Sequence, residues 1–376
     1  LSHPQTISIH LWEKMNKIDI KIKSEVDLLR QVLVHTPGPE MNLLNSHNTK
    51  EFSYDFDRKT FSDNEDFLLW DDTIYLKRAI KEHREMCNVI NTLTSGDTCI
   101  QFKDLYTQVS GSWADKEVIQ NLLFTRDLAF SFGGTTVVSW NSKFARNQEN
   151  IFTKNLFESH PSLNQNKTVF FHEEFPHLTI EGGDVMIFNS ETILIGLSER
   201  TKKESVQALL PYFLDEGFPN VVGISLQKRR AFMHLDTVLT KVNHHEYLIY
   251  DSDDEVDYLK FNKSTPNGES LTSQNLSSLV KEFDEEAMFF KCNHHEQWTC
   301  GSNALAVSPG KILLYERNEE TIRNLIKDGG YRDYTPGEII KGQYNENEKI
   351  VVKINGSELS RGRGGARCMT MPLVRG

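Results

Sequence analysis

The order of hydrophobic and polar residues predicts alternating strands and helices along the chain. Short runs rich in β-branched and aromatic residues predict strands at 29–36, 100–105, 135–140, 185–189, 192–197, 221–226, 247–250, 288–290, 305–307 and 311–315. Apolar residues that recur at helical spacing predict helices at 71–93, 204–216, 274–283 and 319–327. Strands that alternate with helices are typical of α/β proteins, so we expect an α/β fold.

Other patterns predict a loop and two local features. Residues 46–66 are polar and predict a loop. His35 ends the first strand and is expected to make a structural hydrogen bond, because a lone histidine in that position is seldom a ligand. Pro211 lies inside the helix predicted at 204–216 and is expected to kink it.

The composition describes an acidic protein that can bury a large core. The 376 residues are 38% hydrophobic and carry a formal net charge of −11, which disfavours nucleic acid and anionic membranes as partners. No stretch approaches the roughly 20 apolar residues that span a bilayer, and no signal segment opens the chain, so we expect a cytoplasmic protein. The five cysteines, at 87, 99, 292, 300 and 368, show no disulfide framework and are expected to be reduced.

Cys368 lies in the last sixteen residues of the chain, among four glycines and four arginines. Nearby cations stabilise a thiolate and lower the pKa of a thiol from its usual value of about 8.5. We therefore expect a reactive thiolate at this position. Residues 368–374 are apolar and strand-like, which is unusual for a solvated tail.

Acidic residues that precede glycine turns recur with arginines at a fixed distance. Arg146 follows Asp127 by nineteen residues, and Arg200 follows Glu181 by nineteen residues. Each acid comes before a glycine turn and a strand. This repeat predicts duplicated structural units around a common axis, although the sequences between them are dissimilar.

Two other clusters offer metal-binding side chains without the spacing of known sites. The segment 292–300 contains cysteines, histidines and a glutamate, but it lacks the closely spaced cysteine pair of a zinc site. The acidic run at 251–257 lacks the glycine and terminal glutamate of a calcium-binding EF-hand loop. We therefore expect no metal site, and a surface loop at 251–257.

Cys368, His234 and the carboxylates of Asp127, Glu181 and Asp236 fit one kind of chemistry. His234 and Asp236 are two residues apart, so in an extended segment both side chains point to the same side. A thiol with a histidine is typical of covalent catalysis. Three acids suit a cationic substrate such as guanidinium, whose planar N–H groups bind paired carboxylates bidentately.

Five motifs resemble those of bacterial arginine deiminases and occur in the same order. The motifs are Asn121-x-x-Phe-Thr-Arg-Asp, Glu181-Gly-Gly-Asp, Ser198-Glu-Arg-Thr, Met233-His-Leu-Asp-Thr and Arg361-Gly-Arg-Gly-Gly-x-Arg-Cys-Met-x-Met-Pro. The wider family of guanidine-modifying enzymes implies a five-bladed, pseudo-symmetric α/β propeller of ββαβ units. We therefore expect an N-terminal extension at 1–20 and a single catalytic propeller domain at 21–376.

The resemblance implies a catalytic role for each matching residue. Cys368 attacks the guanidinium carbon, and loss of ammonia leaves a thiouronium intermediate that water hydrolyses. His234 acts as general acid toward ammonia and then as general base toward water. Asp127 and Asp236 bind the guanidinium nitrogens, while Glu181 holds the cation and pairs with His234.

The resemblance also implies a subsite for the amino-acid end of arginine. This subsite contains Asn121, Arg146, Arg200 and Arg363, with Phe124 and Gly362 lining the pocket. Cationic side chains suit a free α-carboxylate, so arginine is favoured over agmatine, which has none.

Two features depart from the family pattern. Bacterial arginine deiminases carry several helices before the Asn-x-x-Phe motif, whereas residues 35–121 here predict one, so we expect a short helical insertion at about 60–118. This difference leaves open whether the protein is a homo-oligomer. Leu128 follows Phe-Thr-Arg-Asp, where the family usually has proline.

The resemblance predicts hydrolysis of L-arginine to L-citrulline and ammonia, with a small molecule as the partner and no cofactor or metal. One alternative is an amidinotransferase, or a deiminase that acts on another guanidino compound such as agmatine. An alternative of another class is a non-catalytic arginine-binding protein. Intact Cys368 and His234 weigh against the binding protein.

Overall fold

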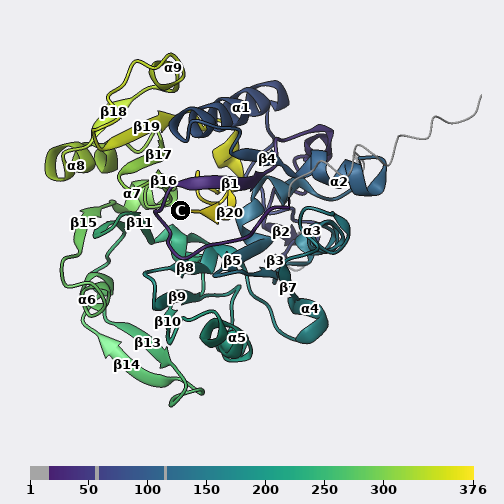
Figure 1. Cartoon of the computed structure of the whole chain (residues 1–376). Coiled ribbons are helices and arrows are strands. Elements are labelled where there is room, and N and C mark those ends of the chain that lie inside the picture. Colours follow the sequence, from purple (N-terminus) through teal and green to yellow (C-terminus); the bar gives the residue numbers. More distant parts are fainter. Residues whose placement is uncertain (1–16, 56–58, 114–116) are drawn as a thin grey trace, which may run out of the picture.

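The computed structural model describes residues 17–55, 59–113 and 117–376. In these ranges the strands form five sheets of three to five strands and one two-stranded hairpin. Each of the five sheets contains two antiparallel strands, then a helix, then a strand parallel to the second one. The fold is therefore mixed α/β and built from ββαβ repeats, with α1, α3, α5, α6 and α8 at the periphery (Figure 1).

The first unit joins the two ends of the described chain. It consists of β20 (Met371–Arg375), β1 (Leu29–Val34), α1 (Leu76–Leu93) and β4 (Cys99–Gln101). β1 pairs antiparallel with β20 and parallel with β4, and β1 and β20 lie side by side near the centre of Figure 1. The residues just before β20 are therefore held in the middle of the fold.

Four further units follow in chain order. The second contains β5 (Ala129–Phe132), β6 (Thr135–Val138), α3 (Asn147–Ser159) and β7 (Lys167–Phe170). The third contains β8 (Val185–Ile187), β9 (Thr192–Leu197), α5 (Lys203–Asp215) and β10 (Asn220–Ser225), and its sheet is extended by β13 (Val256–Phe261) and β14 (Glu269–Ser273). The fourth contains β11 (Leu239–Asn243), β12 (Glu246–Ile249), α6 (Leu276–Lys281) and β15 (Met288–Lys291). The fifth contains β16 (Leu305–Ser308), β17 (Lys311–Tyr315), α8 (Glu319–Gly329), β18 (Arg332–Tyr334), α9 (Pro336–Ile340) and β19 (Ile350–Ile354).

The remaining elements lie between or beside the units. They are the hairpin of β2 (Phe52–Asp55) and β3 (Thr60–Asp63), and the helices α2 (Phe102–Ser110), α4 (Phe171–Glu174) and α7 (His294–Trp298). α1 connects β1 to β4 as the helices of the other units connect their strands, so it belongs to the first unit. Among the described residues between 35 and 121, the hairpin and α2 are the strands and α-helix that lie outside this unit.

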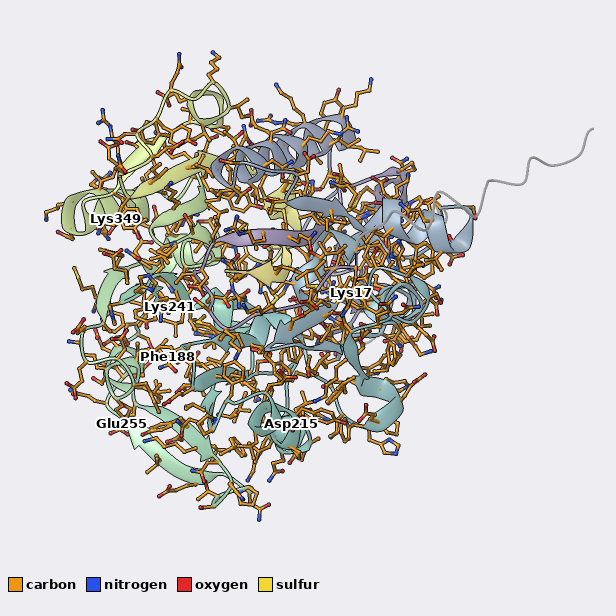
Figure 2. All side chains as sticks on the ribbon, viewed as in Figure 1. Lys17, Phe188, Asp215, Lys241, Glu255 and Lys349 are labelled. Carbon is orange, nitrogen blue, oxygen red and sulfur yellow. The ribbon has the colours of Figure 1, made fainter. Side chains whose placement is uncertain are left out.

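Apolar side chains of the helices pack against the sheets. The buried residues of α5 have the spacing that predicted this helix: Val206, Leu209, Leu210 and Phe213. Pro211 lies inside α5, and the kink expected there stays a prediction. Figure 2 labels two exposed carboxylates, Asp215 and Glu255, and the buried Lys241, whose Nζ donates to the carbonyl of Phe188 at 2.7 Å.

The prediction of a loop at 46–66 is wrong, because this segment contains the hairpin β2–β3. Tyr54 pairs with Phe61, and their rings lie 5.0 Å apart. Phe61 is 69% exposed, so the hairpin has no buried apolar row. Its polar composition therefore gave no strand signal.

Other boundaries also differ from the predictions. The strand predicted at 100–105 ends at Gln101, because β1 offers β4 only three partner residues, and Phe102 begins α2. The helix predicted from residue 71 begins at Leu76. The surface loop predicted at 251–257 ends where β13 begins at Val256.

Three further observations bear on the predictions. His35 Nε2 lies 3.0 Å from Glu40 Oε1, and both side chains are buried, so His35 makes a structural hydrogen bond as expected. Ile18 and Ile20, in the predicted extension, are buried against the domain. Across the part of the chain that the structure describes, no helix has the length and apolar character needed to cross a membrane.

Candidate active site

Polar residues at equivalent positions of the five units converge on one site. Each unit places a polar residue one to three positions before its first strand: Asp127, Asp184, Asp236, Asn303 and Cys368. Three of them lie in short 3-10 turns that lead into the strand. The repeat predicted from the sequence therefore explains how residues far apart in the chain meet.

The thiol of Cys368 contacts residues from two other units. Its Sγ lies 3.2 Å from Asn303 Nδ2 and 3.7 Å from Asp236 Oδ2. A Cβ on Gly365 would lie 2.5 Å from Asn303 Oδ1, so glycine is needed at that position for the close approach. Asn303 Oδ1 also accepts the backbone N–H of Arg367 at 3.1 Å, which fixes the turn that carries the thiol.

The expectation that arginines favour a thiolate at Cys368 is wrong. Burial, together with the carboxylates of Asp236 and Asp127, raises the pKa of the Cys368 thiol well above its usual range. The four arginines of the segment have other partners: Arg361 pairs with Asp72, Arg363 stacks over Trp298, Arg367 pairs with Asp236 and Glu25, and Arg375 donates to backbone carbonyls. In this arrangement the thiol is neutral at physiological pH.

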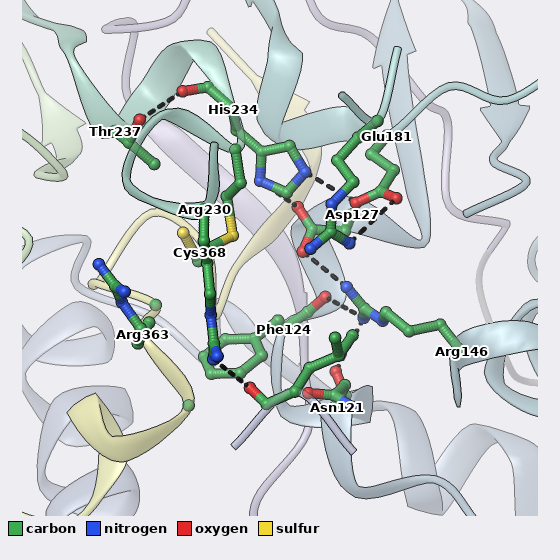
Figure 3. Close-up of a pocket in the computed structure, with 15 residues that line it drawn as sticks. Asn121, Phe124, Asp127, Arg146, Glu181, Arg230, His234, Thr237, Arg363 and Cys368 are labelled. Carbon is green, nitrogen blue, oxygen red and sulfur yellow. Dashed lines mark hydrogen bonds and ion pairs between the residues drawn. The ribbon is translucent and has the colours of Figure 1, made fainter. Parts of the chain in front are cut away.

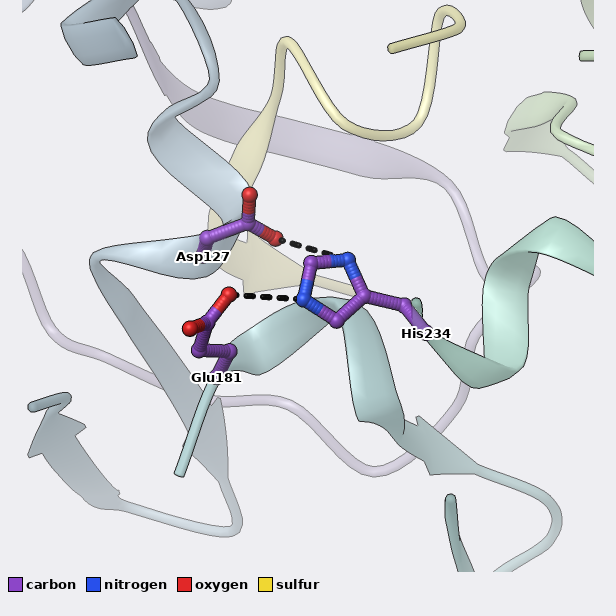
Figure 4. Close-up of side chains that lie close together, drawn as sticks. All are labelled: Asp127, Glu181 and His234. Atoms are coloured by element: carbon purple, nitrogen blue, oxygen red, sulfur yellow. Dashed lines mark hydrogen bonds and ion pairs between the residues drawn. The ribbon is translucent and has the colours of Figure 1, made fainter. Parts of the chain in front are cut away.

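His234 is held between two carboxylates (Figure 4). Its Nε2 lies 2.7 Å from Glu181 Oε2, and its Nδ1 lies 3.6 Å from Asp127 Oδ1. Burial opposes the charged form, but Asp127 and the hydrogen bond with Glu181 outweigh it and raise the pKa of His234 to about 10. His234 is therefore an imidazolium at neutral pH.

The prediction that His234 and Asp236 lie on one extended segment is wrong. His234 has an extended backbone, but Leu235–Thr237 form a 3-10 turn. The turn directs Asp236 Oδ2 toward Arg367, whose Nη1 donates to it at 2.9 Å. Asp236 Oδ2 thus contacts Arg367 and the thiol, whereas His234 pairs with Glu181 and Asp127.

Asp127 and Asp236 each have one carboxylate oxygen without a hydrogen-bond partner among the described residues. Asp127 Oδ2 accepts from Arg146 Nη1 at 2.7 Å, and Asp236 Oδ2 accepts from Arg367 Nη1 at 2.9 Å. The Oδ1 atom of each is buried and has no hydrogen-bond partner among the described residues. Because an unpaired buried acceptor costs free energy, these two oxygens favour a ligand with N–H donors.

Both acid–arginine pairs of the nineteen-residue repeat form ion pairs, although Asp127 and Glu181 stand at different distances from their strands. Arg146 Nη1 lies 2.7 Å from Asp127 Oδ2, and Arg200 Nη1 lies 3.7 Å from Glu181 Oε1. Arg146 directs its other hydrogen bonds to protein groups, namely Glu149 and the carbonyls of Asn121 and Phe124. In the structure Arg146 therefore orients Asp127 and the turn that begins at Asn121.

A pocket opens onto Cys368 (Figure 3). Ten of the eleven predicted site residues line it: Asn121, Phe124, Asp127, Arg146, Glu181, Arg200, His234, Gly362, Arg363 and Cys368. The eleventh, Asp236, contacts the thiol but does not line the pocket.

The family model of arginine deiminase matches residues 115–375 of this chain. The chain belongs to the arginine deiminase family. The arginine deiminase of Borrelia recurrentis is 28% identical to it, over 95% of this chain and 98% of the relative. The arginine deiminase of Listeria monocytogenes is 27% identical over the same shares of the two chains.

Solved structures of other arginine-processing enzymes share the fold of this family member. The N-terminal domain of ArgZ, a cyanobacterial arginine dihydrolase solved with its product, gives a TM-score of 0.57 at 16% identity and covers 93% of this chain and 98% of that chain. DDAH from Pseudomonas aeruginosa, solved with citrulline, gives a TM-score of 0.54 at 14% identity and covers 92% and 99%. At these identities the similarity establishes the fold alone.

Several pocket residues of this arginine deiminase family member were not predicted. They are Leu69, Arg230, Met233, Thr237 and Gly364, together with Asn303 beside the thiol. Arg230 belongs to a basic run just before the Met233 motif, and Asn303 precedes the strand β16 as Asp127 precedes β5. The basic run at Arg230 and the position of Asn303 before a strand could have indicated these two residues from the sequence. The sequence around Leu69 contains no comparable pattern.

Asp127, Glu181 and His234 form the group of side chains whose donor atoms lie close enough to hold a metal ion, within 4.8 Å of one another. A metal ligand must be a neutral imidazole with a free lone pair. The pKa of His234 is raised to about 10, and its Nε2 is hydrogen-bonded to Glu181 at 2.7 Å. These three side chains are therefore suited to holding a proton on the imidazole of His234.

Proposed function

We propose that this protein hydrolyses L-arginine to L-citrulline and ammonia through a covalent adduct on Cys368. The observation that carries the proposal is the pair of buried carboxylate oxygens, Asp127 Oδ1 and Asp236 Oδ1, that have no hydrogen-bond partner among the described residues and belong to carboxylates beside His234 and the thiol. A guanidinium group has the planar set of N–H donors that two such carboxylates accept. Membership of the arginine deiminase family supports the same substrate.

The substrate itself makes the thiolate accessible. Asp236 and Asp127 raise the pKa of Cys368, and a guanidinium bound between these carboxylates offsets their charge. The thiol then gives its proton to a water molecule, and the thiolate attacks the guanidinium carbon. This attack gives a tetrahedral adduct with a new S–C bond.

His234 supplies and then recovers one proton. The imidazolium protonates a nitrogen of the adduct, the C–N bond breaks, ammonia leaves, and an S-alkylthiouronium remains on Cys368. The neutral imidazole then removes a proton from water as the water oxygen attacks the same carbon. The S–C bond breaks as the remaining hydroxyl proton of the adduct passes to sulfur, which yields the ureido group of citrulline and restores the thiol. Glu181 stabilises the imidazolium in both steps through its 2.7 Å hydrogen bond.

We place the amino-acid end of the substrate near Asn121, Arg200 and Arg363, with Phe124 and Gly362 beside its carbon chain. Arg146 supports this end by orienting Asn121 and Asp127. ArgZ was solved with its product and DDAH with citrulline, which supports a ligand of this kind. A free α-carboxylate favours arginine over agmatine.

The architecture assigned to the chain follows the family. We propose that the five ββαβ units form a five-bladed, pseudo-symmetric propeller and that residues 21–376 form one catalytic domain. The repeated unit and the contact between β1 and β20 support this arrangement. The proposed steps use side chains of this domain together with arginine and water.

Product analysis tests the function. The wild-type protein should form equimolar citrulline and ammonia from L-arginine without an added amine, and an amine requirement would indicate an amidinotransferase. Mass spectrometry of protein quenched during turnover should show an amidino adduct on the C-terminal peptide. Cys368→Ala should abolish product while retaining arginine binding, and Cys99→Ala, remote from the pocket, should keep full activity. Normal turnover by Cys368→Ala would exclude the proposed nucleophile.

A further inference from the structure

Arg230 lines the pocket and contacts the segment 69–71 (Figure 3 labels Arg230). Its Nη2 donates to the carbonyl of Leu69 at 3.0 Å and lies 2.8 Å from Asp71 Oδ1. Its guanidinium also stacks over the ring of Phe67 at 4.8 Å. Arg230 lines the same pocket as Cys368, so this cation faces the volume where the substrate lies.

Asp71 is shared between two arginines of the pocket. Its Oδ1 lies 2.8 Å from Arg230, and its Oδ2 lies 3.8 Å from Arg363 Nε. The second distance is too long for a hydrogen bond, and Arg363 Nε is buried with no partner among the described residues. The side chain of Arg363 is only 7% exposed, while that of Asp71 is 40% exposed. Arg230 Nη1 also lies 3.5 Å from Glu51 Oε2, so two partly exposed carboxylates face Arg230, and of these Asp71 is the one that also faces Arg363.

We infer that Arg230 selects substrates with a carboxylate, and that the carboxylate replaces Asp71 as the anion shared by Arg230 and Arg363. This inference rests on the proposed function, because it requires the guanidinium end of the substrate to lie at Cys368. A substrate carboxylate that enters the pocket can approach both arginines, whereas Asp71 pairs closely with one. Asp71 can turn toward solvent because its side chain is partly exposed.

Other charged groups leave room for this role. Arg146 directs its donors to Asp127, Glu149 and two backbone carbonyls, so its hydrogen bonds are already made. Burial raises the pKa of Asp71, and this effect outweighs the opposing charges of Arg230 and Arg363. The two arginines therefore do not fully stabilise the negative charge of Asp71 in its present position. Loss of Asp71 as a competitor should therefore favour the substrate carboxylate.

Calorimetric binding in a Cys368→Ala background tests the inference independently of turnover. Arg230→Gln should raise the Kd of L-arginine by at least about tenfold, because a charge-assisted hydrogen bond is lost. The same change should leave the Kd of agmatine within about twofold, since agmatine has no carboxylate. Asp71→Asn should lower the Kd of L-arginine by about threefold, because the competing anion is removed. Arg229→Gln, an exposed neighbour, is the matched control and should change neither value.

The opposite signs of the two substitutions separate this role from a structural one. If Arg230→Gln and Asp71→Asn both weaken L-arginine binding, the contact only supports the segment 69–71 and the inference is overturned. An equal loss of L-arginine and agmatine affinity in Arg230→Gln overturns it as well. Failure of the proposed function appears separately, as a wild-type protein that forms no citrulline. If Arg230→Gln does not fold, the sign of the Asp71→Asn effect decides.

Discussion

The charge states of Cys368 and His234 follow from where the nearest carboxylates lie. Asp236 Oδ2 lies 3.7 Å from the sulfur, so a thiolate would meet a second negative charge. Glu181 and Asp127 lie 2.7 Å and 3.6 Å from the two imidazole nitrogens, so they favour the imidazolium. The resting site therefore contains a neutral thiol and a charged histidine. The cationic substrate is needed to convert the thiol to a thiolate.

Replacement of Glu181 by glutamine should shift the alkaline limit of activity. His234 acts first as an acid, so activity declines as pH rises through its pKa, which is raised to about 10. Glu181→Gln removes one of the anions that raise this pKa, so the decline should move to lower pH by at least about one unit. The pH dependence of kcat for citrulline formation measures the shift.

Glu199→Gln provides the control for this substitution. Glu199 also pairs with Arg200, at 2.9 Å, but Glu181 is the carboxylate hydrogen-bonded to His234. The pH profile of Glu199→Gln should match that of the wild type. An unchanged profile for Glu181→Gln would show that His234 does not limit the rate as an acid.

The short turns before the strands determine how closely the catalytic groups approach one another. In the turn Gly182–Asp184, a Cβ on Gly183 would lie 2.6 Å from His234 Nδ1 and 2.8 Å from Asp127 Oδ1. Both distances are shorter than van der Waals contact. Glycine at this position therefore allows the backbone of one unit to support residues of two others.

Gly183→Ala should reduce activity far more than stability. The added methyl group displaces His234 or Asp127, and misplacement of a catalytic group by about 1 Å can cost about a hundredfold in rate. The loss in the free energy of unfolding should stay within about 1–3 kcal/mol, the usual cost of an added methyl group in a packed site. Citrulline assays and urea unfolding of the same samples measure both effects.

Gly337→Ala is the matched control at the level of an element. Gly337 lies in the first turn of α9, and a Cβ there meets nothing within 4 Å. Its activity should equal that of the wild type. Comparable losses of activity in the two variants would indicate that the effect of Gly183→Ala is not local.

A network of buried charges joins distant parts of the whole molecule. Arg367 is 1% exposed and pairs with Glu25 at 2.8 Å and with Asp236 at 2.9 Å, while its Nη2 donates to the carbonyl of Val185. Glu25 comes from the start of the described chain, Val185 from the third unit and Asp236 from the fourth. The network holds the turn of Cys368 against the centre of the fold.

Arg367→Met should destabilise the whole fold. It leaves the buried carboxylates of Glu25 and Asp236 without their main counter-ion, and breaking a buried pair in this way typically costs about 3–5 kcal/mol. Arg361→Met removes a surface pair with Asp72 and should cost less than about 1 kcal/mol. Urea unfolding measures both changes, and equal losses would contradict the assigned role of the network.

The sequence alone determined the features that depend on neighbouring residues. The helices α5 and α8 follow apolar spacing, which is a property of a contiguous segment. The candidate residues lie in contiguous motifs, and the repeat of Asp127 with Arg146 and Glu181 with Arg200 is visible as a constant distance along the chain. These motifs, through their resemblance to arginine deiminases, located ten of the pocket residues.

Only the tertiary structure decided the features that depend on distant residues. Asn303 contacts Cys368 across 65 residues, and Arg230 reaches Leu69 across 161 residues, so no local pattern defines either pair. The direction of the C-terminal arginines, and with it the neutral thiol of Cys368, depends on partners such as Glu25 and Asp72. The pKa of a group depends on burial and on charges in space, and the order of residues specifies neither until the chain has folded.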